Sequence, residues 1–389
     1  MLFPSIHLDE KSSARVSRGH RWVFSSDIKN ADASVEQGGE VAVFSAKKEF
    51  LGSALFNRKA LISARIYTEK SQPFDEGYIV AQVRRAVALR EQWLPARKTC
   101  RLIFSESDGL PGLIVERYAN VLVVQFLTLA MDLRKNQIVS ILRRTLAPDA
   151  IVERSDSSGR EYEGLPDSVG VIDGTLPEEL VVDLNGITMR VDLLAGQKTG
   201  MYLDQVENWN LVRSIARGKR VLDLFCNVGG FALNAAKLGA SAVKAIDSSD
   251  MALAQLVSSA ARNNLPNITA KKSDAFLYVR SRPEIFDVIV CDPPPFAKSR
   301  KQLEGALRGY RELNRNCMKM LGEGGTLLTF SCSAAVSGDD FDKMLTLAAR
   351  DAGRTFRLLP GGAQPADHAP LLAMPETQYL KARVLQAVD

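Results

Sequence analysis

The chain has 389 residues, of which 46% are hydrophobic and 24% are charged. This composition is typical of a globular protein with two or three domains and excludes an intrinsically disordered chain. The net charge is +5, from 50 basic and 45 acidic residues, and so small an excess does not by itself indicate nucleic-acid binding.

The five cysteines are an odd number and form no C-x-x-C pair. This pattern argues against a disulfide framework and against a zinc site, and it favours a reducing, cytoplasmic location. The N-terminal segment lacks the long apolar core of a signal peptide. No stretch approaches the ~18 uninterrupted apolar residues of a membrane span, so we expect no membrane partner.

Residues 1–70 are predicted to form a small β-barrel, because β-rich runs at 41–44 and 62–67 alternate with polar turns. The segments "GHRWVF" (19–24) and "FLGSALFNRKALISARI" (50–66) resemble a PUA domain, a small RNA-binding barrel.

Basic and aromatic residues gather in the first of these segments. Arg18, His20 and Arg21 stand beside Trp22, a combination that suits phosphate contact and base stacking. We therefore predict RNA contacts for the three basic residues. The alternative interpretation is a barrel rim with Trp22 in the core.

Residues 71–195 are predicted to form an α+β middle domain. Two segments, "IVAQVRRAVALREQWL" and "DLRKNQIVSILRRTL", have apolar residues at helical spacing. Two hairpins are predicted, one turning at Ala119-Asn120 and one at Asn185-Gly186, and Asn-Gly is the strongest short hairpin signal. This part contains no cluster of catalytic side chains, so we interpret it as a scaffold that receives substrate.

Residues 196–389 are predicted to form a doubly wound α/β domain. Apolar strands alternate with helical segments, with strands at 219–225, 241–247, 286–292 and 325–331. Such alternation predicts a parallel sheet with helices on both faces. Ligands of these sheets bind at the carboxyl ends of the strands.

The turn after the first of these strands indicates which cofactor is bound. It reads "DLFCNVGGF" and has Gly229-Gly230 in place of the G-x-G-x-x-G of dinucleotide folds. Asp223, just before it, would repel a phosphate but would attract a cation. S-adenosylmethionine carries a sulfonium and an ammonium group and no phosphate, so it fits this turn.

Further acidic residues follow the next strands. Asp247 ends the second strand, where a ribose hydroxyl can be bound. Ser248 and Ser249 follow it, and Ser249 could cap the next helix. Asp274 is placed to reach an adenine amino group. A single aspartate at such a position is more often a helix cap or a turn residue. Three aspartates at successive strand ends favour a site that binds S-adenosylmethionine.

The segment "CDPPPFAKS" places Asp292 at a strand end before three prolines. Proline fixes φ and lacks an N–H, so the loop is stiff and suits the holding of a flat base. The alternative is a sharp strand exit. A basic stretch follows at 298–315, and we predict that Lys298 and Arg300 hold phosphates there, although such a helix is often only a solvated face.

Cys332 lies in "TFSCS", directly after the last predicted strand. If that strand neighbours the one before Asp292, at about 4.8 Å, the two side chains face one pocket. A thiolate that adds to C6 of a cytosine makes C5 nucleophilic toward a sulfonium methyl group, which is covalent catalysis. Asp292 could then contact N3 and the amino edge of the base. The other interpretation of Cys332 is a small core residue, which is how Cys226, Cys291 and Cys317 are interpreted.

Taken in order, these segments identify the chain as similar to the PUA-containing, S-adenosylmethionine-dependent methyltransferases of large-subunit ribosomal RNA that make 5-methylcytosine. The resemblance covers nearly the whole chain, and it implies a Rossmann-like C-terminal domain with a mostly parallel, seven-stranded sheet. Besides the segments above, it rests on "GLPGLIVERY", "ERSD", "GQKTGMYLDQVEN", "GYRELNRNCMKML" and "PETQYLK".

This resemblance implies functional residues, with ribosomal RNA as the partner. Cys332 would be the nucleophile and Asp292 the second catalytic residue. The candidate cofactor-binding residues are Tyr202, Gln205, Asp223, Asn227, Gly229, Asp247, Ser248, Asp274, Ala275 and Asp292.

Two departures from related patterns leave parts of the mechanism open. Asn227-Val228 stands where the family commonly has Tyr-Thr. Pro295 stands where the tRNA and small-subunit cytosine-5 enzymes carry a second cysteine, so the base that removes the C5 proton is not identified. His368 is interpreted as structural.

Three other functions remain open at this point, along with the oligomeric state, for which a homodimer is one form. The nearest is a uracil-5 or base-nitrogen methyltransferase acting on RNA. The others are a nicotinamide oxidoreductase on a similar sheet, against which the missing G-x-G-x-x-G argues, and a non-catalytic RNA-binding assembly factor.

Overall fold

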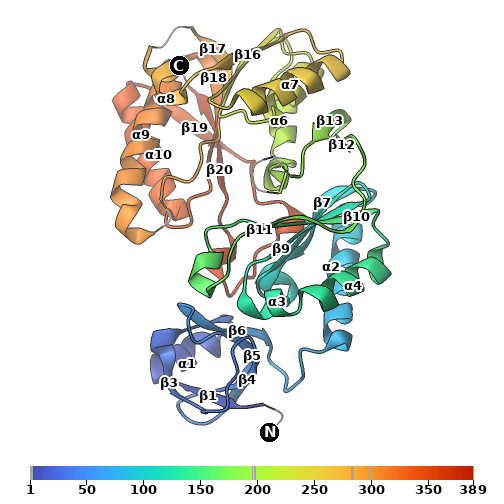
Figure 1. Ribbon diagram of the computed structural model, residues 1–389. Coiled ribbons are helices and arrows are strands. Elements are labelled where there is room, and N and C mark those ends of the chain that lie inside the picture. The colour runs from blue at the N-terminus through green and yellow to red at the C-terminus, as the bar shows by residue number, and fades with distance from the viewer. Residues whose placement is uncertain (1–2, 195, 197–198, 282–283, 298, 389) are drawn as a thin grey trace. The chain divides into compact units, whose positions relative to one another are not determined.

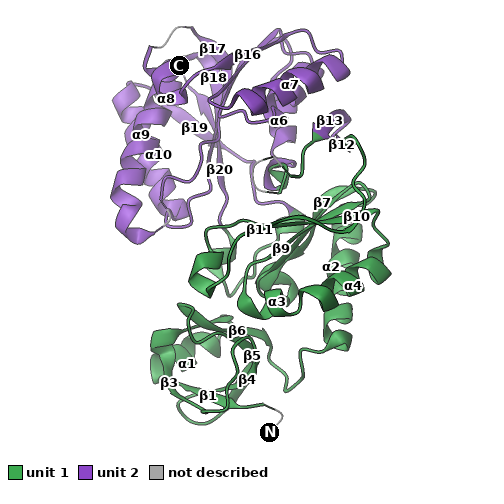
Figure 2. Ribbon diagram, in the orientation of Figure 1, with its two compact units in different colours: residues 1–182, 191–203, 366–378 green, residues 183–190, 204–365, 379–389 purple. Residues whose placement is uncertain are grey.

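A computed structural model describes residues 3–194, 196, 199–281, 284–297 and 299–388 (Figure 1). The chain divides into two compact units (Figure 2). Unit 1 comprises residues 1–182, 191–203 and 366–378, and unit 2 comprises residues 183–190, 204–365 and 379–389. Among the described residues, none of the helices combines the length and the apolar character that a membrane crossing requires.

The N-terminal part of unit 1 is a six-stranded sheet in the order β2-β6-β5-β4-β1-β3. Its pairs are antiparallel except for β1 with β4. The predicted β domain is confirmed, with strands β1 (Ser5–Leu8), β2 (Trp22–Phe24), β3 (Ile28–Ala31), β4 (Glu40–Phe44), β5 (Phe50–Phe56) and β6 (Ile62–Thr68).

A short helix in this part, α1 (Glu10–Val16), was not predicted. It is two turns long, too short to show helical periodicity. Its N-cap is Asp9, whose carboxylate accepts a hydrogen bond from Ser12 N at 2.7 Å.

The rest of unit 1 contains a five-stranded sheet in the order β11-β10-β9-β8-β7. Both predicted helices are present, and their apolar sides pack on this sheet. The strands are β7 (Thr99–Phe104), β8 (Leu113–Tyr118), β9 (Val121–Phe126), β10 (Ala150–Ser155) and β11 (Ser168–Gly174), and the helices are α2 (Glu76–Trp93), α3 (Leu129–Leu133) and α4 (Lys135–Leu146).

Both predicted hairpins are confirmed. Strands β8 and β9 pair antiparallel around Ala119, which has a φ of 54°. The second hairpin joins β12 (Leu180–Leu184) to β13 (Ile187–Val191) through Asn185 and Gly186, with φ of 58° and 73°. Two successive positive φ values are what a type I′ turn requires, which explains the Asn-Gly pair.

Unit 2 is built on a seven-stranded sheet in the order β16-β15-β14-β17-β18-β20-β19. The strands from β16 to β18 are parallel, and β20 is antiparallel to both of its neighbours. The predicted doubly wound fold is confirmed, with strands β14 (Arg220–Leu224), β15 (Ala242–Asp247), β16 (Ile268–Lys272), β17 (Phe286–Cys291), β18 (Leu321–Ser331), β19 (Phe356–Leu359) and β20 (Lys381–Ala387).

Helices cover both faces of this sheet (Figure 1). On one face, α8, α9 and α10 contribute Tyr278, Tyr310 and Phe341 to one buried cluster with the strands. The other face carries α6 and α7. The helices are α5 (Trp209–Ile215), α6 (Gly230–Lys237), α7 (Asp250–Arg262), α8 (Ala275–Ser281), α9 (Leu303–Lys319) and α10 (Gly338–Ala352).

The chain passes between the two units several times. Residues 1–70 and most of 71–195 share unit 1, whereas 183–190 belong to unit 2 and 366–378 return to unit 1. The division into three domains at residues 70 and 195 therefore stays a prediction. Short 3-10 helices occur at Ser25–Asp27, Ser105–Asp108, Arg160–Glu163, Leu203–Gln205, Arg300–Gln302, Ala366–His368 and Pro375–Thr377.

Candidate active site

The parallel strands of unit 2 bring the candidate side chains to one edge of the sheet. At the end of β17, Cys291 is paired with Leu224 of β14 on one side and with Thr329 of β18 on the other. The predicted adjacency of the strands that precede Asp292 and Cys332 is thereby confirmed. Carboxyl ends of neighbouring parallel strands are the place where doubly wound sheets bind ligands.

Asp223 lies in β14 with only 1% of its surface exposed. Its Oδ2 accepts a hydrogen bond from Ala232 N, in the first turn of α6, at 2.9 Å. Burial raises the pKa of Asp223 well above its ordinary value, and the nearby charges of Asp292 and Asp247 add to this effect. Within the described residues, its buried Oδ1 has no hydrogen-bond partner.

Asp247 ends β15 and connects two loops. Its Oδ2 accepts from Asn227 N and its Oδ1 from Ser249 N, both at 2.9 Å. A carboxylate has about four acceptor positions, so it retains the capacity to accept from a hydroxyl group. The loop after β14 and the loop after β15 are therefore held together by the side chain that we predict binds a ribose.

The loop after β14 has an unusual backbone. Phe225, Asn227 and Gly229 have positive φ values of 59°, 48° and 85°. A bulky residue with positive φ is rare, and such strain is concentrated at functional sites. The first N–H groups of α6, which have no acceptor within the helix, follow directly, and that of Ala232 donates to Asp223.

The two glycines of this loop are required by the packing around it. A Cβ on Gly229 would lie 2.1 Å from Leu256 Cδ1 of α7, and one on Gly230 would lie 2.1 Å from Trp209 Cε2 of α5. The glycines thus allow α5 and α7 to approach the loop closely. A direct contact of Gly229 with the cofactor stays a prediction.

Two candidates near the next strand ends are helix caps. Ser249 caps α7 as predicted, accepting from Ala252 N at 3.2 Å. Asp274 is exposed, and its Oδ1 accepts from Leu277 N in α8 at 2.8 Å. Ser248 is exposed and Ala275 is buried, and the contacts of these residues with a cofactor stay predictions.

Gln205 connects the segment before α5 to the proline-rich loop. Its Nε2 donates to Asp292 Oδ2 at 2.9 Å, and its Oε1 accepts from Asn208 Nδ2 at 2.7 Å. Tyr202, three residues earlier, is half-buried and belongs to unit 1. Its predicted contact with the cofactor stays untested.

Cys332 differs from the other cysteines in exposure. It is half-buried, whereas Cys100, Cys226, Cys291 and Cys317 are buried. Its Sγ lies 3.9 Å from the carbonyl oxygen of Pro293, the residue after Asp292. The thiol therefore lies against the proline-rich loop and is not sealed inside the apolar core.

The buried cysteines agree with the structural role predicted for three of them. Burial raises the pKa of Cys100 to about 11 and that of Cys226 and Cys291 well above the ordinary thiol value. Thiols of this kind stay protonated near neutral pH and are poor nucleophiles.

The serine that follows Cys332 holds the proline-rich loop. Ser333 Oγ accepts from Phe296 N at 3.0 Å and from Ala297 N at 3.3 Å, and it lies 2.9 Å from the hydroxyl of Tyr310. The loop after β17 is therefore tied to the end of β18. Its attachment fixes Pro293 beside the thiol.

Two residues of "PETQYLK" lie near the site although sequence reasoning gave them no role. The Lys381 amine donates to the carbonyl oxygens of Ser333 and Tyr379, both at 2.7 Å. The Tyr379 hydroxyl donates to Asp204 Oδ2, beside Gln205, at 2.8 Å. In the sequence this motif supports only the family resemblance, because it is far along the chain from Ser333 and Asp204.

The RNA-binding candidates of the N-terminal domain differ in accessibility. Arg18 is exposed, and Arg21 forms an ion pair with Glu69 at 3.1 Å. His20 is buried, with Nε2 3.3 Å from Glu376 Oε1. Trp22 is half-buried, so its interpretation as a core residue is wrong, and its Nε1 donates to Glu106 Oε1 at 2.7 Å. Base stacking by Trp22 stays a prediction.

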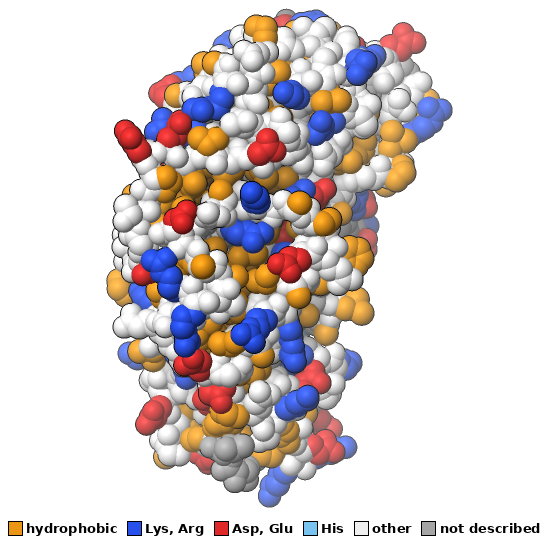
Figure 3. Space-filling model, turned by 90° about the vertical axis from the view of Figure 1, so that its right-hand side faces the viewer, with side chains coloured by type: hydrophobic (Ala, Val, Ile, Leu, Met, Phe, Trp, Pro, Cys, Tyr) orange, Lys and Arg blue, Asp and Glu red, His pale blue; other side chains and the backbone are white. Residues whose placement is uncertain are grey.

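The basic stretch after the proline-rich loop is partly neutralised. Ion pairs join Arg308 to Glu304 and Arg311 to Asp351, both at 2.6 Å. Arg300 is exposed, and Lys298 lies outside the described residues. On the face shown in Figure 3, basic side chains are interspersed with acidic ones.

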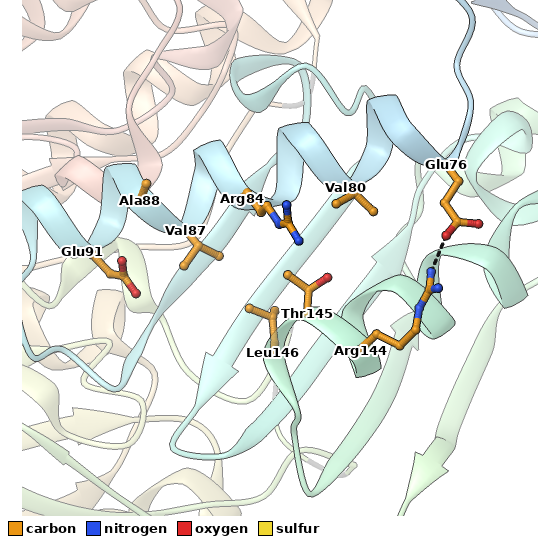
Figure 4. Close-up of a pocket in the computed structure, with 9 residues that line it drawn as sticks. All are labelled: Glu76, Val80, Arg84, Val87, Ala88, Glu91, Arg144, Thr145 and Leu146. Atoms are coloured by element: carbon orange, nitrogen blue, oxygen red, sulfur yellow. Dashed lines mark hydrogen bonds and ion pairs between the residues drawn. The ribbon is translucent and has the colours of Figure 1, made fainter.

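Unit 1 has a groove of its own between α2 and α4 (Figure 4). The Arg144–Glu76 ion pair, at 2.6 Å, closes one end of it. Its lining contains none of the predicted site residues and consists of Glu76, Val80, Arg84, Val87, Ala88, Glu91, Arg144, Thr145 and Leu146.

The strand-end residues of unit 2 suit S-adenosylmethionine. The charges of Asp292 and Asp247 act on the buried Asp223, and one buried oxygen of Asp223 has no partner among the described residues. A cationic ligand that donates hydrogen bonds would offset the unfavourable burial of this acidic group.

Comparisons with family models and curated proteins give two domains and one activity. Residues 6–69 match a PUA-like domain, and residues 145–359 match an S-adenosylmethionine-dependent methyltransferase. The chain is 39% identical to a ribosomal RNA large subunit methyltransferase I from Shewanella amazonensis, covering 95% of this chain and 96% of that protein. It is 38% identical to the protein of the same name from Photobacterium profundum, covering 97% and 98%.

Comparisons with solved structures give the same fold. A protein from Streptococcus mutans described as a SAM-dependent methyltransferase matches with a TM-score of 0.84 and 21% identity, covering 98% of this chain and 99% of that one. A methyltransferase structure complexed with SAH matches with the same TM-score, identity and coverage.

Proposed function

The chain belongs to the family of S-adenosylmethionine-dependent large-subunit ribosomal RNA methyltransferases that carry a PUA-like domain, and from this premise we propose that it methylates C5 of a cytosine through a covalent adduct with Cys332. The bound S-adenosylmethionine supplies the methyl group. The residues of this chain hold the base, provide the nucleophile and accept or release protons.

The proposed reaction proceeds through a bond between sulfur and carbon. The Cys332 thiolate adds to C6 of the cytosine, and the electron pair of the C5–C6 double bond becomes available at C5. C5 takes the methyl group as the S–CH3 bond of the sulfonium breaks, which would leave S-adenosylhomocysteine, and C5 then loses its proton to a base. The Sγ–C6 bond breaks as the double bond is restored, and the thiolate is regenerated.

The observation that carries this proposal is the place of Cys332. Its sulfur is half-buried at the end of β18, 3.9 Å from the carbonyl oxygen of Pro293, while every other cysteine of the chain is buried. Asp292, beside Pro293, is held by Gln205, and we expect its carboxylate to accept from the amino edge of the base.

The test is methyl transfer from labelled S-adenosylmethionine to large-subunit ribosomal RNA by Cys332→Ala. We expect transfer to fall to background while calorimetry shows unchanged cofactor binding. Cys100→Ala, which also replaces a thiol by a methyl group, but in unit 1, should retain activity. Full transfer by Cys332→Ala would refute the covalent mechanism.

The modified nucleoside decides between cytosine and its alternatives. The covalent steps apply to uracil as well, so mass analysis of nucleosides from treated RNA must show 5-methylcytidine and not 5-methyluridine or a base-nitrogen product. Mapping modified bases in ribosomal RNA from cells with and without the gene would name the position and would exclude a non-catalytic assembly role.

We also propose that basic residues of both regions bind the phosphates of the RNA. Arg18 is the accessible candidate in the N-terminal domain, and Arg300 and Lys298 are the candidates after the proline-rich loop. Each replacement by Gln should weaken RNA binding. It should also lower the slope of the logarithm of the binding constant against the logarithm of the salt concentration by about 1, which corresponds to one phosphate contact. His20→Gln serves as the comparison, since its burial argues against a direct contact.

A further inference from the structure

Lys381 stands opposite the end of the strand that carries the nucleophile. It is the first residue of β20, and it pairs in antiparallel register with Ser331, the last residue of β18. Cys332 is the next residue along the chain. The Lys381 amine donates to the carbonyl oxygen of Ser333 at 2.7 Å, so it reaches past Cys332 to the residue that follows.

The amine is positioned by backbone atoms only. Its second acceptor is the carbonyl oxygen of Tyr379, also at 2.7 Å, and within the described residues it has no carboxylate partner. Only 9% of the lysine surface is exposed. Burial lowers the pKa of Lys381 to about 8, while the charge of Cys332 acts in the opposite direction and favours the ammonium form. Two carbonyl oxygens leave one of the three N–H donors available.

Among the described residues, three other ionisable groups, at β17, α9 and β20, do not favour the thiolate of Cys332. Asp292 follows β17 and is itself a carboxylate. From α9, the Tyr310 hydroxyl faces this region, and burial together with the charge of Cys332 raises its pKa, so it stays neutral. Arg383 of β20 is paired with Asp342 of α10 at 2.6 Å. Within the part of the chain that the structure describes, Lys381 is therefore a cation placed to compensate a negative charge on the sulfur.

We propose that the Lys381 ammonium stabilises the thiolate of Cys332 and so generates the nucleophile of the methyl transfer. The inference rests on the function proposed above. The thiol gives its proton to water, and the lysine keeps its three protons throughout. Lys381 is a positioning residue that acts through Cys332, in the way that cations beside reactive cysteines favour the ionised form.

The test measures the thiolate directly. The full-length protein is treated with iodoacetamide at a series of pH values and digested with trypsin, and alkylation is quantified in the peptide of residues 320–343. Cys332 is the only cysteine in this peptide. The rate against pH reports the midpoint of thiolate formation at Cys332 alone, and it requires no methyl transfer.

Three variants separate charge from structure. Lys381→Met removes the charge and keeps the length of the side chain, and we expect its midpoint to rise by at least one pH unit, with about a tenfold slower alkylation at pH 7. Lys381→Arg should keep a midpoint close to that of wild type. Arg383→Met removes one positive charge two residues away on the same strand and should also leave the midpoint unchanged.

A wild-type profile in Lys381→Met would overturn the proposal, because a lysine that only ties two carbonyl groups together would not move the thiol midpoint. If Lys381→Met does not fold, the reciprocal experiment decides. Removal of the thiolate in Cys332→Ala should lower the pKa of Lys381 and speed its acetylation at pH 8, and an unchanged rate would count against the proposal.

These outcomes are independent of the covalent mechanism. Full methyl transfer by Cys332→Ala would remove the proposed role of the cysteine, yet the alkylation profiles would still decide whether Lys381 stabilises its thiolate. Conversely, an unshifted profile would leave the covalent mechanism intact and would remove only the role of Lys381.

Discussion

Gln205 holds the carboxylate of Asp292 through a hydrogen bond of 2.9 Å from its Nε2, although the two residues are 87 positions apart in the chain. Asn208 fixes the amide of Gln205 in turn. The orientation of Asp292 thus depends on the segment that precedes α5 and not only on its own loop.

Replacement of Gln205 by Met should therefore impair catalysis. The change removes a donor to a partly buried carboxylate, an effect of about 1–3 kcal/mol, or roughly 5- to 150-fold in kcat/KM. Steady-state kinetics with S-adenosylmethionine and ribosomal RNA measure it. Gln92→Met, on the exposed side of α2, is the control. Unchanged kinetics in Gln205→Met would mean that Asp292 keeps its orientation by other contacts.

Asp223→Asn should make the unliganded protein more stable at neutral pH while it weakens cofactor binding. The pKa of Asp223 is raised in the folded state, so its protonated form contributes stability that is lost as pH rises through this raised value. The gain in melting temperature should be present at pH 7.5 and should shrink as the pH falls toward the ordinary aspartate value. An equal gain at every pH would contradict this explanation.

Gly230→Ala should destabilise unit 2 by about 2 kcal/mol, because the added methyl group would collide with the ring of Trp209. Gly230 has no positive φ, so the effect is one of packing. Gly305→Ala in α9 is the matched control. Its Cβ would be 3.8 Å from Arg308 Nη2, and alanine should increase the free energy of unfolding by about 0.5–1 kcal/mol there. Denaturant unfolding of both variants provides the comparison.

Arg65→Met should destabilise unit 1 by about 3 kcal/mol, since it leaves the buried Glu106 without its countercharge. Burial acts to raise the pKa of Glu106, but the Arg65 charge and the hydrogen bonds outweigh it and hold the pKa below its ordinary value. In wild type, the stability that the ionised Glu106 contributes is present above the ordinary glutamate pKa, and it is lost as the pH falls through the lowered pKa.

The deficit of Arg65→Met should accordingly be largest near pH 7 and should diminish as the pH falls, because the buried Glu106 of the variant, without the Arg65 charge, takes up a proton at a higher pH than in wild type. Urea unfolding at several pH values measures this dependence. The exposed Lys59→Met should remain within about 0.5 kcal/mol of wild type. A deficit that is independent of pH would point to lost packing of the arginine stem.

Much of unit 2 could be predicted because its central strands are apolar runs that end in polar residues. The strands β14, β15, β17 and β18 follow from that pattern, whereas the adjacency of β17 and β18 is expected from the usual strand order of the family. The strands β16, β19 and β20 are less regular in sequence, and β16 is largely exposed, so its composition differs little from that of a loop.

The contacts that complete the site could not be predicted, since they join segments far apart in the chain. Nothing local in "PETQYLK" places the Lys381 amine beside Ser333, and nothing in "FSCS" indicates that Ser333 binds the backbone of Phe296. Similarly, the indole of Trp22 binds Glu106, and no pattern of polarity in either segment connects the two. Such pairings are set by the fold as a whole.

The return of residues 366–378 to unit 1 limits how this molecule can be dissected. Those residues lie between β19 and β20, and β20 separates β19 from β18 in the sheet. A fragment of unit 2 that stops at residue 365 loses β20, the strand between β18 and β19. A fragment of unit 2 that continues to the C-terminus includes residues 366–378 without the rest of unit 1. We therefore expect that the two units must be expressed and engineered together, as one polypeptide.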